Sequence, residues 1–337
     1  MEWLNVCISA ALFAQPPAPT PPTPPAPPAP AKPAPVAVAA PSTATSAPIV
    51  VAEGGWRKAG SCNDCCEEKR FQSDRCFDGF IGPITSPIYA KDPRSLTEIR
   101  ALYTHNWNPG DRALGGGDFD LYGLQARLAL SESVQVFMDK AGYLSVDTGN
   151  AGIRNRDGWL DLGLGVKWTF LRDTCDQEVA AVGIMYEFAT GEDEVFQGRG
   201  DGIVTPFITY GKEFGDCWHF IGNAAYSAAL DSSENSSFLF SQLHLDKGIN
   251  GWLYPLVELN WFYYTQSGNT TRANGERDGV FSFGDEGTAG THRLTIAGGL
   301  KAKLRRNMET GIAYERALTG GDDMFNHRIV GEFILRY

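Results

Sequence analysis

Cysteines are the residues of this chain whose type and spacing most clearly suggest chemistry. There are seven, and four of them lie within "SCNDCCEEKRFQSDRC". The disulfide candidates are Cys62, Cys65, Cys66, Cys76, Cys175 and Cys217. Cysteines at this density in an exported protein usually form disulfides. The rival is a zinc site, because two of them have C-x2-C spacing, but a second pair and a nearby histidine are missing. We therefore expect disulfides of unknown pairing, no metal and no cofactor.

Catalytic groups are the next possibility, and the five histidines are the candidate bases. His219 and Ser227 share one side of a predicted strand, but they are eight residues apart and no orienting group is evident. The acidic stretch "GEDEVFQGRGDG" lacks the spacing of an EF-hand loop, so we read it as a solvated loop. The sequence therefore predicts no enzymatic activity.

Charged side chains also recur at every second position of long alternating stretches. In "WLDLGLGVKWTF", apolar residues alternate with Asp161, glycines and Lys167. Strict alternation places the two sets on opposite faces of a strand. On the face that we predict to point inward lie Arg100, Arg127, Asp139, Asp161, Lys167, Glu187, His244, Asp246, Glu258, Asn260, Arg293, Lys301, Glu315, Glu332 and Arg336. Such a wall could line a solute passage, or its ion pairs could only stabilise the protein.

The elements that carry these residues are twelve predicted strands. They lie near residues 97–107, 118–130, 133–145, 159–170, 178–190, 203–214, 217–229, 237–248, 251–265, 290–304, 307–318 and 326–337. All are longer than the roughly 5–6 residues of an ordinary strand. A tilted strand that crosses a membrane needs about 9–11 residues.

The connections alternate between tight turns such as "SES" and "GD" and long polar loops, so the two ends of the sheet differ. That asymmetry is typical of outer-membrane barrels. Closure also pairs every backbone group in hydrocarbon. We predict an all-β protein with a closed up-and-down antiparallel transmembrane β-barrel of about 12 strands. The alternative is a soluble barrel or sandwich, because alternation alone does not say which face points inward.

Composition divides the chain into four parts. We predict a signal peptide over 1–15, a disordered Pro/Ala-rich spacer over 16–53, a Cys-rich periplasmic segment over 54–95 and the barrel over 96–337. The spacer could reach the cell wall, and "CFDGFIGPITSPIYAKDP" is apolar enough to dock at the barrel mouth. A net charge of -11 argues against a nucleic-acid partner.

The printed sequence ends on an alternating stretch with an aromatic last residue. Phe333, Leu335 and Tyr337 resemble the terminal recognition signal of outer-membrane barrels. The stretches "KDPRSLTEIR", "GGGDFDLYGLQ", "FQGRGDG" and "WLYPLVELNWF" resemble an uncharacterised family in the outer-membrane porin and transporter superfamily, and are similar to barrels of the phenol-degradation type. The resemblance implies residence in outer-membrane lipid and insertion by the barrel assembly machinery.

Together these observations predict an outer-membrane channel or transporter for small solutes, with a narrow lumen of mixed charge. The alternative is a structural barrel that anchors to the cell wall or to a periplasmic partner through its N-terminal segment.

Overall fold

The computed structural model describes residues 70–110, 115–150, 154–270, 278–319 and 325–337. The predicted signal peptide, the spacer and the candidates Cys62, Cys65 and Cys66 lie outside the described residues. The chain divides into two compact units, Met1–Gly54 and Gly55–Tyr337, and the second contains everything described below. No helix among the described residues is long and apolar enough to cross a membrane.

Fourteen strands and one short 3-10 helix, η1 (Asp193–Val195), make up the regular structure of the described residues. The strands are β1 (Glu98–Trp107), β2 (Gly117–Ala129), β3 (Val134–Lys140), β4 (Gly142–Thr148), β5 (Arg156–Trp159), β6 (Leu162–Asp173), β7 (Glu178–Phe188), β8 (Ile203–Phe214), β9 (Trp218–Ala229), β10 (Ser237–Lys247), β11 (Leu253–Gln266), β12 (His292–Arg305), β13 (Met308–Ala317) and β14 (His327–Arg336).

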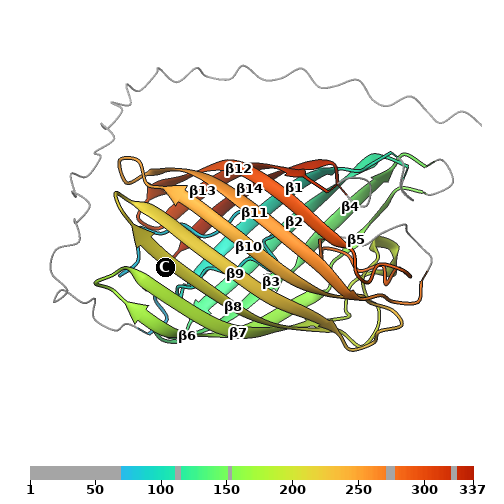
Figure 1. Ribbon diagram of the computed structural model, residues 1–337, viewed down its shortest axis with the longest axis horizontal. Coiled ribbons are helices and arrows are strands. Elements are labelled where there is room, and N and C mark those ends of the chain that lie inside the picture. Colours follow the sequence, from blue (N-terminus) through green and yellow to red (C-terminus); the bar gives the residue numbers. More distant parts are fainter. Residues whose placement is uncertain (1–69, 111–114, 151–153, 271–277, 320–324) are drawn as a thin grey trace, which may run out of the picture. The chain divides into compact units, whose positions relative to one another are not determined.

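The sheet closes on itself. The last strand, β14, pairs antiparallel with β1 from Glu98↔Arg336 to Trp107↔His327, and β1 also pairs with β2. Strands β3 and β4 are two parts of one barrel strand, as are β5 and β6, so the wall has twelve strands (Figure 1). This confirms the predicted closed antiparallel barrel.

Two of the twelve predicted strands are interrupted, which alternation did not reveal. The register between β3 and β6 shifts at Met138/Lys140, and a single residue separates the end of β3 at Lys140 from the start of β4 at Gly142. At this β-bulge the two-residue period is lost, so both Asp139 and Lys140 point inward and are buried. A second interruption separates β5 from β6, and Leu160 is buried there instead of facing outward as its parity predicted.

The outer face of the barrel is apolar. Leu243, Val257 and Ile312 lie in the middle of their strands and expose 49%, 52% and 56% of their surface. Trp168 and Trp261 lie on the same face and are also exposed. Large apolar residues exposed around a closed sheet match a barrel surrounded by lipid rather than by water.

A charge introduced in the middle of this face should destabilise the barrel far more than the same charge at its edge. We expect Leu243→Arg to lower the free energy of unfolding by about 2–4 kcal/mol, because it places a cation at the depth of the bilayer centre. Leu230 is equally exposed but lies just beyond β9, so Leu230→Arg should cost only about 0–1 kcal/mol. Urea unfolding in lipid vesicles measures both, and equal losses would contradict a membrane-facing surface.

Candidate functional site

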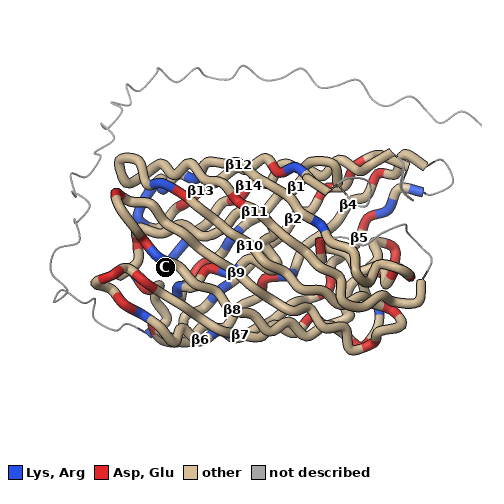
Figure 2. The backbone as a smooth tube through the Cα atoms, in the orientation of Figure 1, with Lys and Arg blue, Asp and Glu red and all other residues tan. Residues whose placement is uncertain are grey.

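The fifteen predicted inward side chains all lie on the inner side of the wall. Fourteen are buried and Arg127 is half-buried. Figure 2 shows acidic and basic positions interspersed along the barrel. Arg127 ion-pairs with Glu98 at 2.6 Å and Asp139 at 3.1 Å, and Arg336 with Glu98 at 2.9 Å. Neighbouring charges of opposite sign therefore compensate one another within the barrel.

The interior is filled by a segment that we call the plug, Ser73–Leu96. The Ser73 N–H donates to the Tyr337 carbonyl oxygen at 2.8 Å, and the Asp74 N–H donates to the Ser95 carbonyl oxygen at 2.8 Å. The plug thus enters and leaves at the barrel end that holds the tight turns and Tyr337 (Figure 1). All of it except Leu96 belongs to the predicted Cys-rich segment 54–95, and it lies inside the barrel wall.

Glu258 holds the middle of the plug. Its two carboxylate oxygens accept the Ile84 and Thr85 backbone N–H groups, each at 2.8 Å, and the Thr85 hydroxyl donates to the same group. The Thr85 carbonyl oxygen accepts from Gln242 at 3.1 Å. An irregular segment has no strand partner, so its buried backbone groups need side-chain partners of this kind.

Wall side chains satisfy the carbonyl oxygens of the plug at several more points. Three of these carbonyls belong to prolines, which cannot donate to a sheet. The pairs are Arg100 with Pro83 at 3.1 Å, Gln125 with Pro87 at 2.9 Å and Thr169 with Pro93 at 3.0 Å. Lys301 donates to Gly82 at 2.7 Å, and Lys303 to Phe80 at 3.1 Å. The wall therefore binds the plug mainly through its backbone.

The plug also brings its own charges into the barrel. Lys91 ion-pairs with Asp139 of the wall at 2.7 Å, and Asp92 with Arg94 of the plug at 2.6 Å. Burial lowers the pKa of Lys91, and Asp139 only partly offsets this. Burial opposes ionisation of Asp92, but Arg94 and Lys167 outweigh it and hold the pKa of Asp92 far below its usual value. Its basic neighbours therefore favour the ionised form of Asp92 inside the barrel.

Histidines form part of the same inner surface. His244 lies between Asp246 and Glu258, at 3.0 and 2.8 Å, and His219 contacts Asp246 at 2.8 Å. This chain of groups leads directly to the carboxylate that holds the plug. Ser227, considered above as a partner of His219, lies beside Tyr89 instead.

The long-loop end is closed by loops that fold inward. Phe281 packs against Phe119 with ring centroids 5.3 Å apart, and Gln197 donates to the Val280 carbonyl oxygen at 3.0 Å. Asp161 accepts the Gly191 and Gly198 N–H groups at 2.8 and 2.9 Å, which orders a second loop. Two more residues of the predicted inward set have partners inside the barrel. The Arg293 guanidinium lies over the Tyr264 ring, and Glu187 forms an ion pair with Lys140 at 2.5 Å.

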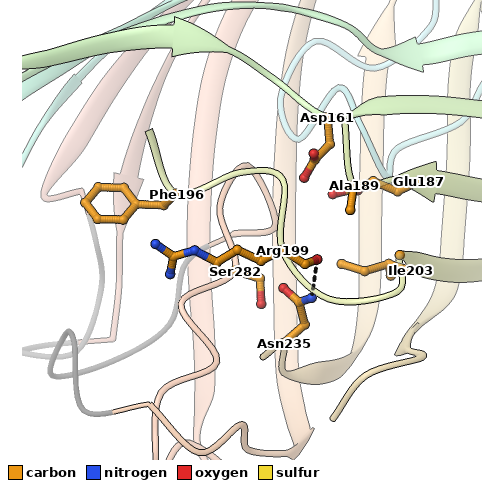
Figure 3. A pocket seen from close by; sticks show the side chains of 9 residues that line it. Asp161, Glu187, Ala189, Phe196, Arg199, Ile203, Asn235 and Ser282 are labelled. Carbon is orange, nitrogen blue, oxygen red and sulfur yellow. Dashed lines mark hydrogen bonds between the residues drawn. The ribbon is translucent and has the colours of Figure 1, made fainter. Parts of the chain in front are cut away.

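A cavity of about 10 Å³ remains at this mouth (Figure 3). Asp161, Glu187 and Arg199 line it, and Asn235 donates to the Arg199 carbonyl oxygen at 3.0 Å. Its size suits about one water molecule. A much larger hollow of about 970 Å³ lies against outward residues such as Ile99, Val166 and Ile184, so it belongs to the lipid-facing surface and not to the lumen.

Asp278 fastens the inward-folded loop to the wall through Arg328, which also pairs with Glu315 at 2.6 Å. We expect Asp278→Asn to lower the free energy of local opening of residues 278–285 by about 1.5–3 kcal/mol, because a buried bond between charged groups is lost. Hydrogen exchange in micelles measures this. Glu286→Gln, at an exposed position of the same loop, is the control. Unchanged exchange in Asp278→Asn would show that the ion pair does not hold the loop.

The described cysteines lie in the plug and in two tight turns. Cys76 is half-buried against the cluster of Phe77 and Phe80, and Cys175 lies in the β6–β7 turn. Cys217 is exposed in the β8–β9 turn and has a free thiol, so the structure does not include it in a disulfide as predicted. Its backbone has a φ of 58°, and the turn directs it to the surface. That the other cysteines form disulfides remains a prediction.

Sequence reasoning missed several groups of this site. The plug residues Lys91, Asp92 and Arg94 lie in a stretch without period, and no pattern assigned them to the interior. Glu98 and Glu309 were missed because they lie at strand ends, where parity is least certain. Both ion-pair with Arg336, Glu309 at 2.6 Å, and the inward parity of β1 and β13 would have identified them.

Comparisons with known proteins give the fold a context. No protein-family description and no curated protein matches this sequence. Among solved structures, an outer-membrane channel from Pseudomonas putida F1 is similar over 77% of this chain and 100% of its own, with 12% identity and a TM-score of 0.53. The NanC porin covers 72% of this chain and 98% of its own, with 10% identity and a TM-score of 0.44. At such identities the likeness concerns the fold alone.

Proposed function

We propose that this protein is an outer-membrane channel for small solutes, and that the plug closes it in the state described here. One observation carries the proposal: the lumen is occupied by an irregular segment that wall side chains bind, not by strands of the barrel. The ladder of hydrogen bonds around the wall is complete without the plug. A segment docked in this way can leave while the barrel remains closed on itself.

The wall has the composition of a hydrated passage. When the plug leaves, Glu258, Lys301, Lys303 and Arg100 lose their plug partners and face water. A twelve-stranded barrel is intermediate between filled eight-stranded barrels and wide sixteen-stranded porins. We therefore infer a narrow lumen of mixed charge, which would pass small hydrated solutes rather than large ones. The Pseudomonas protein of similar fold is a channel, which makes conduction the first activity to test.

The same proposal assigns the two ends of the barrel. Outer-membrane barrels have short periplasmic turns and longer external loops. We therefore place the tight turns, Tyr337 and the entrance of the plug on the periplasmic side. The spacer predicted for residues 16–53 would then extend from that side toward the cell wall.

A sealed structural barrel is the second candidate, and the filled lumen favours it. The two candidates differ in current across a planar bilayer. We expect the full-length refolded protein to be closed most of the time, and to open in discrete reversible steps when moderate urea loosens the plug. Heat-shifted migration on a gel shows whether the barrel itself is intact. Silence up to the urea concentration that unfolds the barrel would favour the sealed barrel and reject the channel.

A further inference from the structure

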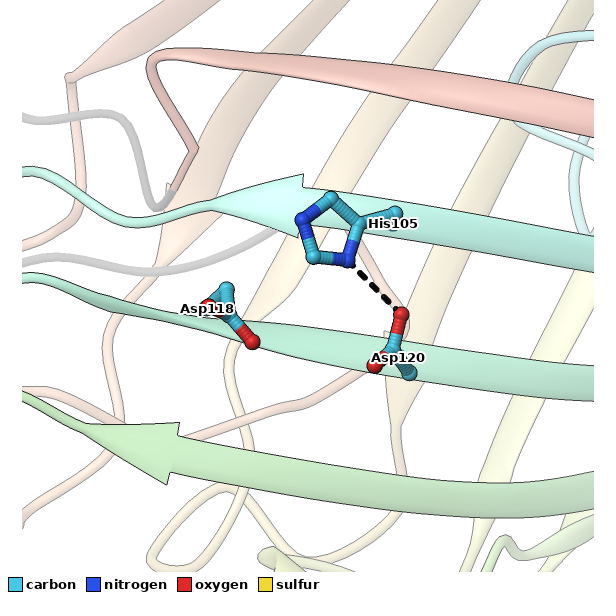
Figure 4. Close-up of side chains that lie close together, drawn as sticks. All are labelled: His105, Asp118 and Asp120. Carbon is cyan, nitrogen blue, oxygen red and sulfur yellow. Dashed lines mark hydrogen bonds and ion pairs between the residues drawn. The ribbon is translucent and has the colours of Figure 1, made fainter.

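The apolar outer face is interrupted at the long-loop end of β1 and β2. Along β2, the outward residues Tyr122, Leu124 and Leu128 are exposed and apolar, but the first two outward positions are Asp118 and Asp120. His105 of β1 lies directly opposite Asp120 in the register. Figure 4 shows the three side chains together on this face. We call His105, Asp118 and Asp120 the rim cluster.

The rim cluster brings together three side chains of the types that ligate metal ions. One ligand atom from each residue lies within 4.8 Å of the others. His105 Nδ1 and Asp120 Oδ1 are 2.8 Å apart and hydrogen-bonded to each other, so a bound ion would take the place of the proton between them. The Tyr103 hydroxyl donates to Asp120 Oδ1 at 2.6 Å. A hydrogen bond of this kind orients a ligating carboxylate from outside the coordination sphere.

Charge gives a second, independent reason to expect a cation. Asp147 of β4 lies directly opposite Asp118, on the other side from β1. Carboxylates directly opposite one another on neighbouring strands are destabilising. Neither Asp118 nor Asp147 forms an ion pair within the described part of the chain. Among the described residues, the only basic group that ion-pairs with these acids is the His105 imidazole, which bonds Asp120. A bound cation would neutralise the unbalanced charge.

We propose that the rim cluster binds one divalent transition-metal ion of the Zn²⁺ class. One imidazole nitrogen with two carboxylate oxygens suits Zn²⁺, whereas Ca²⁺ and Mg²⁺ prefer oxygen ligands alone. The side chains of His105 and Asp120 are 24% and 25% exposed, so water can complete the coordination. The ion would join β1 to β2 at the edge of the membrane, where the strands pass into the external loops.

Cobalt tests the site, because Co²⁺ replaces Zn²⁺ and its visible absorption reports nitrogen and oxygen ligands. The full-length protein is refolded in micelles with its thiols alkylated and titrated with Co²⁺, then with Zn²⁺ as competitor. We expect one ion per chain, and His105→Gln and Asp118→Asn should each weaken binding roughly tenfold or more. His327→Gln is the matched control: His327 stacks on Trp107 at the same rim but is outside the cluster. The His327→Gln protein should bind Co²⁺ with the same affinity as the unaltered protein.

A footprint on the unaltered protein keeps the test independent of how the variants fold. Zn²⁺ should protect His105 from diethyl pyrocarbonate, while exposed His292 reacts as before. Ca²⁺ at the same concentration should give no protection. The proposal is overturned if His105 and His292 respond alike to Zn²⁺, if Ca²⁺ protects as well as Zn²⁺, or if folded His105→Gln binds Co²⁺ as tightly as His327→Gln.

Discussion

Deleting residues 73–96 should turn a mostly closed protein into one that conducts continuously in discrete steps. The deletion removes the segment that fills the lumen and leaves the β1–β14 and β1–β2 ladders in place. The wall groups that lose plug partners can then bond water, so the barrel should still fold. Planar-bilayer recording measures the open probability, which we expect to approach one.

The matched control for this deletion removes residues 16–53, which are outside the plug, and should leave the current of the full-length protein unchanged. Heat-shifted migration must first show that both deletions form barrels. A plug-deleted barrel that shifts on heating but passes no current would contradict a channel and leave the sealed barrel as the better account. Equal conduction by the two deletions would show that the spacer, and not the plug, controls opening.

Replacing Glu258 by Gln should open the channel without removing any chain. The carboxylate accepts two plug N–H groups at 2.8 Å each and also bonds His244 at 2.8 Å. A neutral amide keeps the size but loses the charge, at a cost of about 1.5–3 kcal/mol to plug docking. When the closed state is destabilised by this amount, the ratio of open to closed channels should rise roughly 10–100-fold. Single-channel recording gives the ratio.

Glu178→Gln is the control for that change. Glu178 begins β7 beside a tight turn and pairs with Lys212 at 2.9 Å, and its side chain forms no hydrogen bond or ion pair with the plug. The open probability of the Glu178→Gln channel should match that of the unaltered protein, because ion pairs near the surface contribute only about 0–1 kcal/mol to stability. If the two substitutions have the same effect, Glu258 does not hold the plug, and the contact described above has no role in closure.

The wall of this barrel could be predicted from sequence because its physical cause is local. Each strand separates lipid from the interior, so apolar and polar residues alternate along it. The strand predicted over 203–214 has the same bounds as β8, and the strand predicted over 237–248 differs from β10 by one residue. The interruption near Lys140 could not be predicted, because a β-bulge depends on the pairing with neighbouring strands and not on the alternation of residues within its own strand. Tyr337, the last residue of the predicted terminal signal, is 66% exposed.

The contents of the barrel could be predicted only in part. Alternation assigned Glu258 and Lys301 to the interior, and both are buried. It could not show that their partners are backbone groups at Ile84, Thr85 and Gly82. Those contacts join residues more than a hundred positions apart, and the plug has no regular alternation of apolar residues from which its position could be predicted. Its apolar composition suggested docking at the barrel mouth, whereas the segment extends through the interior to Tyr89, which reaches the Gly279 carbonyl oxygen.

The most direct test of closure by the plug is a reversible cross-link between plug and wall. A Cβ at Gly311 would lie 2.9 Å from Ile84 Cδ1, so cysteines introduced at these two positions face each other when the plug is seated. Mass spectrometry of the oxidised protein shows whether the disulfide between them has formed. The Ile84→Cys, Gly311→Cys protein should be silent in a planar bilayer when oxidised, even in moderate urea. It should recover its openings on reduction, while the unaltered protein is recorded with the same reductant as the control. Discrete conduction by the fully cross-linked protein would contradict closure by the plug.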